Sequence, residues 1–511
     1  MNIKIQIVLS LVTLTSLMAT EPQNETDPTL IGSDKNVNIS DDNPTMAGDS
    51  ISANLDKKSY FLGSQTIMDA FKNGKVKGLI RYSAQNRDSN LHVLQDDPGN
   101  PPPDQNIKQY SALGGYLGYE TAPLYNITIG GTFYTSNPVG NNPNQYSGLG
   151  GLGERHNEQV AYSVLGEAYL KYDDSKSRLV IGRQEMPDYR FVSLSNIRMS
   201  PLTHEGVTYE NRSIENLRIN FAYIDKMKER NAVKFIDMIE GSRVSQGKTE
   251  GNIDSSNYDA DGHYVGKGEA MSMVGAVYTG EGYVLEGWDY YIPNFINTTY
   301  AYAQFSTDVL DDITLSFALQ GSTQDDVGDA VAGNISSWFW GAKIQAYSEG
   351  VTFFTNVNQI AYNENSYDGG TIFVRWGTPQ MFNSFQVQDS ELAGTKSLGF
   401  GLQYDLGYHN LLPHFVARVR YGIYDMPDAL EDKYAAQDRT EATFDLRWSL
   451  EKTDGFGIFT QMDGLSVQFR IAYDDYKTDY DFAAYQAEHG YSFESVTSDF
   501  VDTRLYIDYQ F

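Results

Sequence analysis

Apolar and polar residues alternate along most of the chain from residue 75 onward, as in β-strands whose successive side chains point to opposite faces. Between 465 and 473 the odd-numbered residues are all apolar, and the even-numbered ones are polar or small. Between 415 and 424 the odd-numbered residues are again apolar, while the even-numbered ones include Arg418 and Arg420. Each such strand can place one face against an apolar phase and the other against water.

The stretch 160–172 keeps the same period less cleanly. One face is expected to hold the apolar residues Tyr162, Val164, Ala168, Leu170 and Tyr172. The opposite face then carries Glu167 and Lys171, but also Leu165 and Tyr169, which blur the alternation. We assign this stretch to a strand of the same kind.

The alternation predicts about 18 strands, with boundaries good to about two to four residues. The strands are expected near 75–86, 108–120, 124–134, 160–172, 176–184, 204–211, 215–226, 270–279, 281–292, 297–307, 311–322, 335–347, 350–361, 395–405, 413–424, 439–453, 461–474 and 500–511. Brief turns alternate with longer links, except at 293–296, which is short where a long link is due. Short turns on one side and long loops on the other are typical of outer-membrane barrels.

These patterns predict an all-β fold, a transmembrane antiparallel β-barrel with short periplasmic turns and long extracellular loops. No stretch after residue 20 approaches the roughly 20 apolar residues of a membrane-spanning helix. A closed barrel satisfies every backbone hydrogen bond within lipid, which a sheet with open edges does not. An even number of strands places both termini in the periplasm.

The first 60 residues differ from the rest of the chain. Residues 1–20 combine Lys4 with an apolar run and small residues, which is typical of a secretory signal peptide; a first transmembrane helix is the alternative. Residues 21–60 are acidic and polar and are expected to form a largely disordered periplasmic leader. A segment that plugs the pore is the alternative. Residues 61–511 are assigned to the barrel.

The composition of the 511 residues excludes several other classes. A formal charge of −29 argues against a nucleic-acid partner, which needs a basic surface. The absence of cysteine excludes disulfides, thiolate metal sites and cysteine nucleophiles. Tyr, Phe and Trp make up 13% of the residues, which suits the aromatic girdles of membrane barrels.

The chain ends on RLYIDYQF, in which Leu505, Ile507, Tyr509 and Phe511 share one face. An amphipathic final strand with a terminal aromatic residue is what the outer-membrane assembly machinery reads in such barrels. We therefore expect contact with the barrel-assembly machinery through Phe511, and with outer-membrane lipid and lipopolysaccharide along the wall.

Several stretches resemble the OprD-type family of substrate-selective outer-membrane porins, namely 111–136, 166–184, 196–211, 216–231 and 440–450. The resemblance covers most of 75–511 and is most specific in 111–231. It implies a barrel of about 18 strands, monomeric or loosely trimeric, whose narrow pore is constricted by inward-folded loops. It also implies passage of amino acids, peptides or carboxylic acids without catalysis.

The pores of this family carry a ladder of basic side chains, and several arginines of this chain fall on polar strand faces. They are Arg81, Arg178, Arg218, Arg418, Arg420, Arg447 and Arg470, with Arg504 also in phase and Arg183 out of phase. An arginine that faces lipid near the membrane midplane destabilises the folded barrel by about 2–4 kcal/mol, so an inward position is favoured. The alternative is a purely structural lining, in which the arginines pair with Glu167, Asp405, Asp445 and Asp508.

Two long loops, 185–203 and 362–394, are expected by the same resemblance to fold into the pore and set its width. The candidate constriction residues in them are Asp188, Arg198, Asp368 and Arg375. Rings of charged side chains are a recognised selectivity device, and plain exposure of these charges is the alternative. The positive charge of the arginines favours anionic or zwitterionic solutes, although the net charge of the whole chain is negative.

Other motifs carry less weight. Residues 148–153 match G-x-G-x-x-G, but no βαβ unit surrounds them. Asn257, Asp259 and Asp261 resemble the start of a calcium loop, yet the closing acid, Glu269, comes one position late. No Ser–His–Asp set or helical His pair is recognisable, so we expect no catalytic residue, metal or cofactor.

The sequence as a whole predicts an exported outer-membrane porin for passive uptake of small solutes, and not an enzyme. Two alternatives remain, an outer-membrane barrel enzyme and a structural or adhesive barrel that displays its loops. Conductance after reconstitution separates the porin from both alternatives.

Overall fold

The computed structural model describes residues 64–93, 105–187, 189–193, 198–242, 266–310, 312–377, 381–388, 390–427, 436–450, 464–478 and 495–511. The chain divides into two units, Met1–Ser40 and Asp41–Phe511, and all the described residues belong to the second. The predicted signal peptide, the leader up to residue 60 and the suggested calcium ligands therefore lie outside them. In this part of the chain, no helix is long and apolar enough to cross a membrane.

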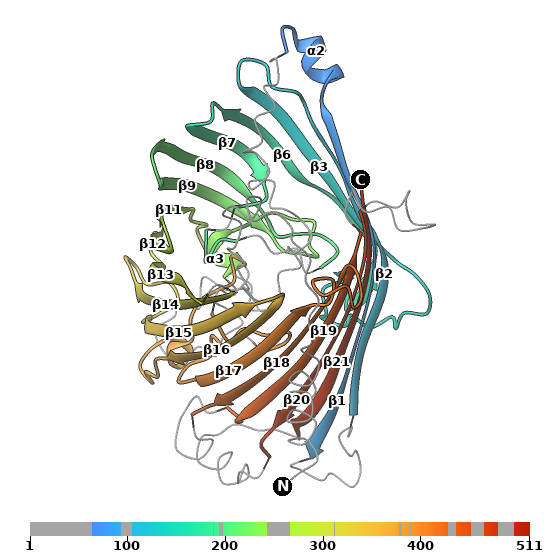
Figure 1. Cartoon of the computed structure of the whole chain (residues 1–511), viewed down its shortest axis with the longest axis vertical. Coiled ribbons are helices and arrows are strands. Elements are labelled where there is room, and N and C mark those ends of the chain that lie inside the picture. The colour runs from blue at the N-terminus through green and yellow to red at the C-terminus, as the bar shows by residue number, and fades with distance from the viewer. Residues whose placement is uncertain are drawn as a thin grey trace. The chain divides into compact units, whose positions relative to one another are not determined.

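One antiparallel sheet forms the wall of the second unit and closes on itself (Figure 1). Each wall strand pairs with the next one along the chain, and β1 (Lys75–Val93) pairs with β21 (Ser495–Gln510) to close the ring. The sheet has nineteen strands, but β10 (Ile236–Asp237) only extends the pairing of β9, which leaves eighteen strands in the wall. The predicted barrel and its number of strands are confirmed.

The other wall strands are β2 (Gln105–Glu120), β3 (Ile127–Pro138), β6 (Tyr162–Asp173), β7 (Ser177–Gln184), β8 (Thr203–Ile214), β9 (Leu217–Lys228), β11 (Met271–Gly280), β12 (Tyr283–Ile292), β13 (Ile296–Leu310), β14 (Ile313–Asp326), β15 (Ser336–Ser348), β16 (Val351–Ile360), β17 (Lys396–Asp405), β18 (Phe415–Asp425), β19 (Arg439–Ser449) and β20 (Leu465–Tyr476). A small hairpin pairs β4 (Gly153–Arg155) with β5 (Glu158–Val160). The helical segments are α2 (Ile67–Lys72), α3 (Met238–Gly241) and the 3₁₀ turn η6 (Tyr367–Gly370).

The alternation read from the sequence sorts the side chains of most strands correctly. In β20, Arg470 and Asp474 are buried inside the barrel, whereas Phe469 and Tyr473 are exposed on its outer face. This order follows from the period of two, because neighbouring side chains of a strand cannot share a face. The polar lumen and the apolar outer wall are therefore built from the same strands.

Strand β6 departs from the predicted faces. Tyr162 and Val164 are buried inside, whereas Leu165 and Leu170 are exposed on the outer face. The register between β3 and β6 shifts next to Gly166, so a β-bulge there reverses the alternation. The prediction that Tyr162 and Val164 share a face with Leu170 is wrong for this reason.

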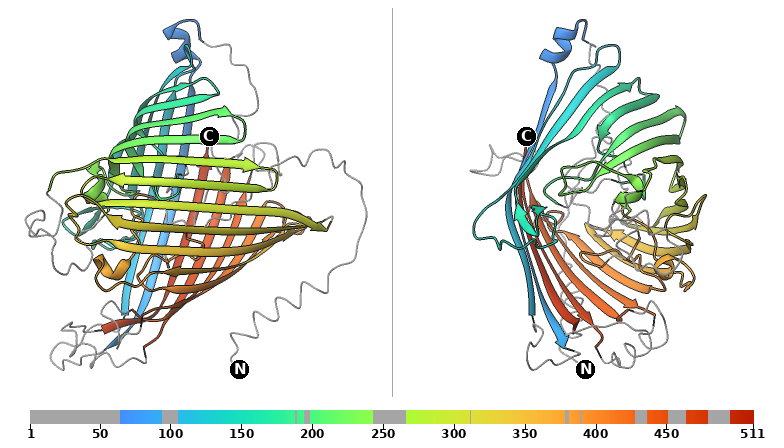
Figure 2. Two further views of the ribbon diagram at one scale, coloured as in Figure 1. Left: turned by 90° about the vertical axis from the view of Figure 1, so that its left-hand side faces the viewer. Right: turned by 180° about the vertical axis from the view of Figure 1, so that it is seen from behind.

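Most connections follow the predicted order of short turns and long loops (Figure 2), but the β19–β20 link spans 450–464 instead of the expected 454–460. The β2–β3 turn is tight, with Tyr125 and Asn126 at φ angles of 52° and 65°, the left-handed pair that such turns need. The link between β12 and β13 spans only residues 293–295, as the short spacing predicts. Short turns face the periplasm in barrels of this kind, which places α2 and the chain end on that side.

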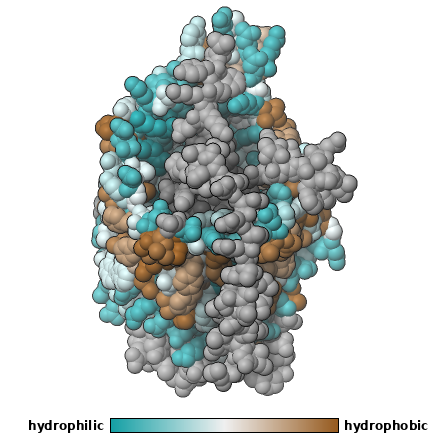
Figure 3. Space-filling view, in the orientation of Figure 1, coloured by the Kyte–Doolittle hydropathy of each residue, from teal (hydrophilic) through white to brown (hydrophobic). Residues whose placement is uncertain are grey.

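Aromatic side chains gather on the outer wall near the short turns. Tyr283 stacks on Tyr278 and on Phe305, with ring centroids 5.8 and 6.3 Å apart, and Tyr509 stacks on Phe511 at 6.0 Å. In Figure 3, patches of apolar side chains lie on the flanks of the molecule, and hydrophilic side chains gather toward its top. These stacks correspond to the interfacial girdle expected of a membrane barrel.

Two long loops fold into the barrel and pack against its inner wall. The β7–β8 loop (185–202) and the β16–β17 loop (361–395) share one apolar cluster with α3 and the inner faces of β9 and β11–β15. Tyr189, Val192 and Trp376 of these loops are fully buried. The cluster occupies the side of the lumen along β11–β15, opposite the wall formed by β18–β21 and β1 in the ring order.

Candidate functional site: an arginine-lined lumen

An arc of arginines lines the inner face of β18–β21 and β1. Arg418, Asp445, Arg470 and Arg504 are direct cross-strand neighbours in one row over β18–β21. The row continues to Gln85 of β1. Side chains directly opposite one another in a sheet lie close enough to interact, so this register alone brings four charges together.

Asp445 is shared by two of these arginines. Its Oδ2 lies 3.5 Å from Nη2 of Arg418 and 3.0 Å from Nε of Arg470. The amide of Gln468 donates to both carboxylate oxygens, at 3.0 and 2.9 Å. Asp445 and Arg470 are buried. The attraction between the two charges offsets part of the free energy that their removal from water costs.

Arg81 and Arg504 pair with two further carboxylates. Arg81 is held by Asp508 through Nε and Nη2, at 2.8 and 2.6 Å. Arg504 donates from Nε to Oδ1 of Asp502 at 2.7 Å, and Arg87 lies 2.9 Å from the other carboxylate oxygen of Asp502. Arg81, Arg418, Arg470 and Arg504 of the arc are therefore each paired with a carboxylate.

The carboxylates named as partners in a structural lining are only partly those observed. Asp445 and Asp508 pair with arginines, but Glu167 pairs with Lys77 at 3.0 Å. Asp405 lies exposed at the end of β17, where its Oδ1 accepts a hydrogen bond from the backbone N–H of Gly407. Asp405 is therefore a turn residue and not part of the lining.

Arg420 and Arg447 lie in the rows on either side of Arg418. The guanidinium of Arg420 is buried over the ring of Phe385 from the β16–β17 loop, 4.7 Å from its centroid. Its Nε donates to Oγ1 of Thr443 at 3.3 Å. Arg447 is a half-buried neighbour of Gln468 in the row nearer the short turns.

Arg178 and Arg218 face the lumen from another part of the wall, on β7 and β9. Arg178 is the cross-strand neighbour of Glu210, and Arg218 has its Nε buried without a hydrogen-bond partner in the described part of the chain. The structure does not join these two arginines to the arc on β18–β21. Arg183 is out of phase as predicted, and its Nε lies 2.8 Å from Glu205.

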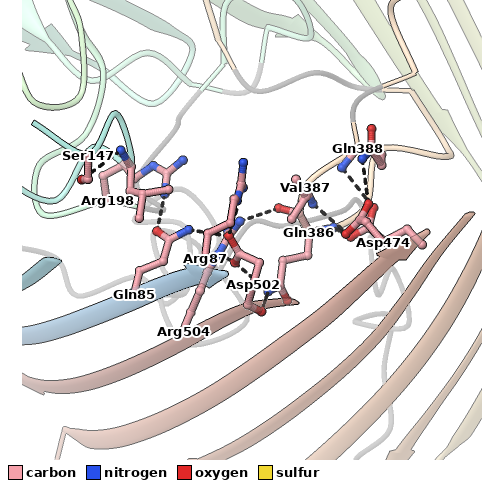
Figure 4. A network of polar contacts seen from close by, with 12 residues as sticks. Gln85, Arg87, Ser147, Arg198, Gln386, Val387, Gln388, Asp474, Asp502 and Arg504 are labelled. Atoms are coloured by element: carbon pink, nitrogen blue, oxygen red, sulfur yellow. Dashed lines mark hydrogen bonds and ion pairs between the residues drawn. The ribbon is translucent and has the colours of Figure 1, made fainter. Parts of the chain in front are cut away.

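The predicted constriction residues have different surroundings. Arg198 reaches the arc, because its Nη1 lies 3.0 Å from Oε1 of Gln85 and its carbonyl accepts from Arg81 (Figure 4). Asp368 is partly buried in η6, with a φ of 45°, and Arg375 is exposed between buried neighbours. Asp188 lies outside the described residues.

Sequence reasoning missed the carboxylate that holds the β16–β17 loop, Glu441 of β19. Its two oxygens accept backbone hydrogen bonds from Gln386, Val387 and Gln388, at 2.9, 3.0 and 3.0 Å. Gln388 also donates to Asp474 at 2.7 Å, as Figure 4 shows. Three N–H donors on one buried carboxylate fix this part of the loop against the arginine arc.

The β7–β8 loop is held in the same way by a pair that the sequence did not reveal. Arg190 inserts into the opposite wall and forms a two-pronged ion pair with Glu286 of β12, with Nε–Oε2 at 2.8 Å. Its guanidinium lies over the ring of Tyr302, 4.3 Å from the centroid. Arg190 has a φ of 61°, a rare conformation that this set of contacts keeps in place.

Trp376 links the β16–β17 loop to the wall and to α3. Its carbonyl lies 3.1 Å from Nε2 of His204, and its indole N–H donates to the carbonyl of Met238 in α3 at 2.9 Å. Trp376 and His204 are both fully buried. His204 is therefore a wall residue that contacts the β16–β17 loop.

A second group of charges lies where the β7–β8 loop begins. The hydroxyl of Tyr134 lies 3.0 Å from Oε1 of Glu185 and 3.2 Å from Oε2 of Glu167. Lys77 pairs with Glu167, and Lys228 faces Glu185 from β9. Burial, together with the charge of Glu167, raises the pKa of Glu185 to about 7.

The raised pKa of Glu185 predicts pH-dependent conduction. Glu185 loses its proton as the pH rises from 6 to 8, which adds a negative charge to the base of a loop that enters the lumen. We expect anion conductance to fall over this range in wild type and to stay level in Glu185→Gln, measured in planar bilayers. An equal fall in the variant would contradict the assignment.

The raised pKa of Glu185 also makes the stability of the folded chain depend on pH. Its pKa in the folded chain lies above the ordinary value of 4.5, so folding favours the protonated form. The contribution is fully present below about pH 4.5 and is lost as the pH rises toward about 7. A pH series of thermal unfolding, compared with that of Glu185→Gln, measures it.

The closed wall, the aromatic outer face and the polar lumen narrowed by two loops together define a channel of the outer-membrane porin class. The family model described as outer membrane porin, OprD family, matches residues 139–511, and the chain belongs to this family. This confirms the resemblance read from the sequence and places the protein in the bacterial outer membrane.

Solved structures of porins share the fold at low sequence identity. Pseudomonas aeruginosa OpdK, crystallised with vanillate, has 17% identity and a TM-score of 0.64, over 86% of this chain and 99% of OpdK. P. aeruginosa OccK9 and Acinetobacter baumannii OccAB3 each have 15% identity and a TM-score of 0.66, over 86% of this chain and 99% and 100% of their own. No curated protein matches the chain in sequence.

Proposed function

We propose that this porin is a narrow, moderately selective channel for passive uptake of small solutes that carry a carboxylate, such as amino acids, short peptides and carboxylic acids. It acts as a channel and not as an enzyme. The observation that carries this proposal is the row of Arg418, Arg470 and Arg504 on the inner wall, facing loops that narrow the lumen.

The local charges decide the selectivity of such a pore, and the net charge of −29 does not. At about 0.15 M salt, charges are screened over about 8 Å, so only groups beside the passage act on a solute. Arg198 and Arg420 bring further positive charge to the loops that meet this wall. The related OpdK was crystallised with vanillate, an aromatic carboxylate, which is consistent with a cargo of this class.

The test is the ion selectivity of the purified protein in planar bilayers. We expect anion preference in wild type, and a several-fold loss of that preference in the double variant Arg418→Ala, Arg420→Ala. Arg183→Ala, which removes an arginine from the outer wall, is the matched control and should change nothing. Strong cation preference that the double variant leaves unchanged would overturn the proposal.

The solute class is tested separately by liposome swelling with amino acids, dicarboxylates and uncharged sugars. Faster entry of the carboxylates than of sugars of similar size is expected. We also propose that Phe511 is read by the barrel-assembly machinery, and that the porin is a monomer or a homotrimer in contact with lipopolysaccharide. The first of these rests on the amphipathic final strand β21 and on Phe511, which follows it and is 49% exposed.

A further inference from the structure

Helix α2 ends just before β1 begins and lies beyond the strand ends, at the periplasmic end of the barrel (Figures 1 and 2). The ring of Phe71 stacks on the ring of Tyr119, with centroids 6.5 Å and planes 12° apart. Tyr119 is the cross-strand neighbour of Val76, which points away from the lumen. The helix is therefore attached to the membrane-facing side of the wall and not to the lumen.

Backbone hydrogen bonds fix the helix in this place. The N–H of Ala122 donates to the carbonyl of Ala70 at 2.9 Å, and the N–H of Ser64 donates to that of Pro123 at 2.9 Å. The hydroxyl of Tyr119 also donates to the carbonyl of Phe71. These bonds join both ends of α2 to the β2–β3 turn, so the direction in which its side chains point is set by the barrel.

The outer side of α2 is apolar and exposed. Ile67, Met68 and Phe71 have 69%, 63% and 51% of their surface exposed. On the membrane-facing side of the neighbouring wall, Val76 and Leu117 are 60% and 58% exposed. Exposed apolar surface of this kind marks contact with a membrane or with another protein.

We propose that α2 is an interfacial anchor that inserts Ile67, Met68 and Phe71 into the periplasmic leaflet of the outer membrane. Lys72, exposed at the end of the helix, then lies at the level of the lipid phosphates. Helices with one apolar side and a basic residue beside it lie in the membrane interface in this way. A lipid occupant is favoured over a protein because Phe71 stacks on Tyr119, which lies on the same outward face of β2 as the exposed Leu117.

The absence of cysteine allows a direct test with the full chain in vesicles of phosphatidylethanolamine and phosphatidylglycerol. An environment-sensitive fluorophore is attached to the thiol of the Met68→Cys variant and quenched either by nitroxide-labelled lipid or by aqueous iodide. We expect several-fold stronger quenching by the lipid. The matched control, Lys176→Cys in the exposed β6–β7 turn, should be quenched mainly by iodide.

Conductance of the labelled protein shows that the barrel is folded, since Met68 lies outside the lumen. Quenching of the label at position 68 mainly by iodide would overturn the proposal. Protection from both quenchers would overturn it as well, because a protein partner would then cover the helix. Adding Ile67→Ser and Phe71→Ser to the labelled variant should shift the emission to the red and weaken the lipid quenching.

Discussion

Replacing Glu441 with alanine is expected to free residues 386–388 of the β16–β17 loop, to enlarge the pore and to weaken its selectivity. Glu441 is fully buried, and three backbone N–H groups of the loop depend on its carboxylate. A buried donor left without a partner costs about 1–3 kcal/mol, so the folded loop position loses several kilocalories per mole unless water enters. We expect single-channel conductance to rise at least about twofold, because freeing one such loop widens a pore that inward-facing side chains narrow.

Single-channel recording and reversal potentials measure this effect. Glu441→Gln is the graded variant, because the amide keeps one acceptor oxygen and should give an intermediate result. Glu281→Gln, in the exposed β11–β12 turn, is the matched control and should leave conductance unchanged. If Glu441→Ala conducts and selects like wild type, the loop is held by other contacts.

Replacing Arg190 with alanine is expected to have the largest effect on stability. The side chains of Arg190 and Glu286 are 7% and 8% exposed, and removing one partner leaves the other charge buried. Breaking a buried ion pair in this way costs about 3–5 kcal/mol. The β7–β8 loop should loosen at the same time, because the pair ties it to β12. Thermal unfolding and open-channel noise measure the two effects.

A pair on the outer wall gives the matched control for Arg190. Arg183 and Glu205 are 38% and 33% exposed, and an exposed pair of this kind is worth about 0–1 kcal/mol. Arg183→Ala should therefore be nearly neutral. The double variant Arg190→Ala, Glu286→Ala should recover part of the lost stability, since no unpaired charge remains. If Arg190→Ala lowers the stability no more than Arg183→Ala does, the ion pair of Arg190 and Glu286 does not hold the β7–β8 loop.

Most of the wall was predictable because a strand has a period of two wherever one face meets lipid. The inward position of Arg470 and the outward position of Phe469 follow from that rule alone. The bulge beside Gly166 was not predictable, since one extra residue leaves the composition of the strand unchanged. It reversed the faces of Tyr162 and Val164, which pack around the inner loops instead of meeting lipid.

The candidate site was predictable only where it depends on strand phase. No local sequence pattern marks Glu441 and Glu286 as contacts of the inner loops, because the residues they bind lie 55 and 96 positions earlier in the chain. Folding brings these partners together through loops whose path no periodicity describes. The sequence indicated which loops enter the lumen by resemblance, and the contacts that hold them came from the structure.

The pairing of Asp445 with both Arg418 and Arg470 has a consequence for the speed of transport. A solute carboxylate that reaches this row meets a resident competitor for each guanidinium. When the solute carboxylate binds one of these arginines, Asp445 loses its contact with that arginine. We therefore expect the solute to be held only briefly and to move quickly to the next row. A channel needs sites that solutes leave as readily as they enter. A row of arginines that already share a carboxylate favours fast passage over tight binding.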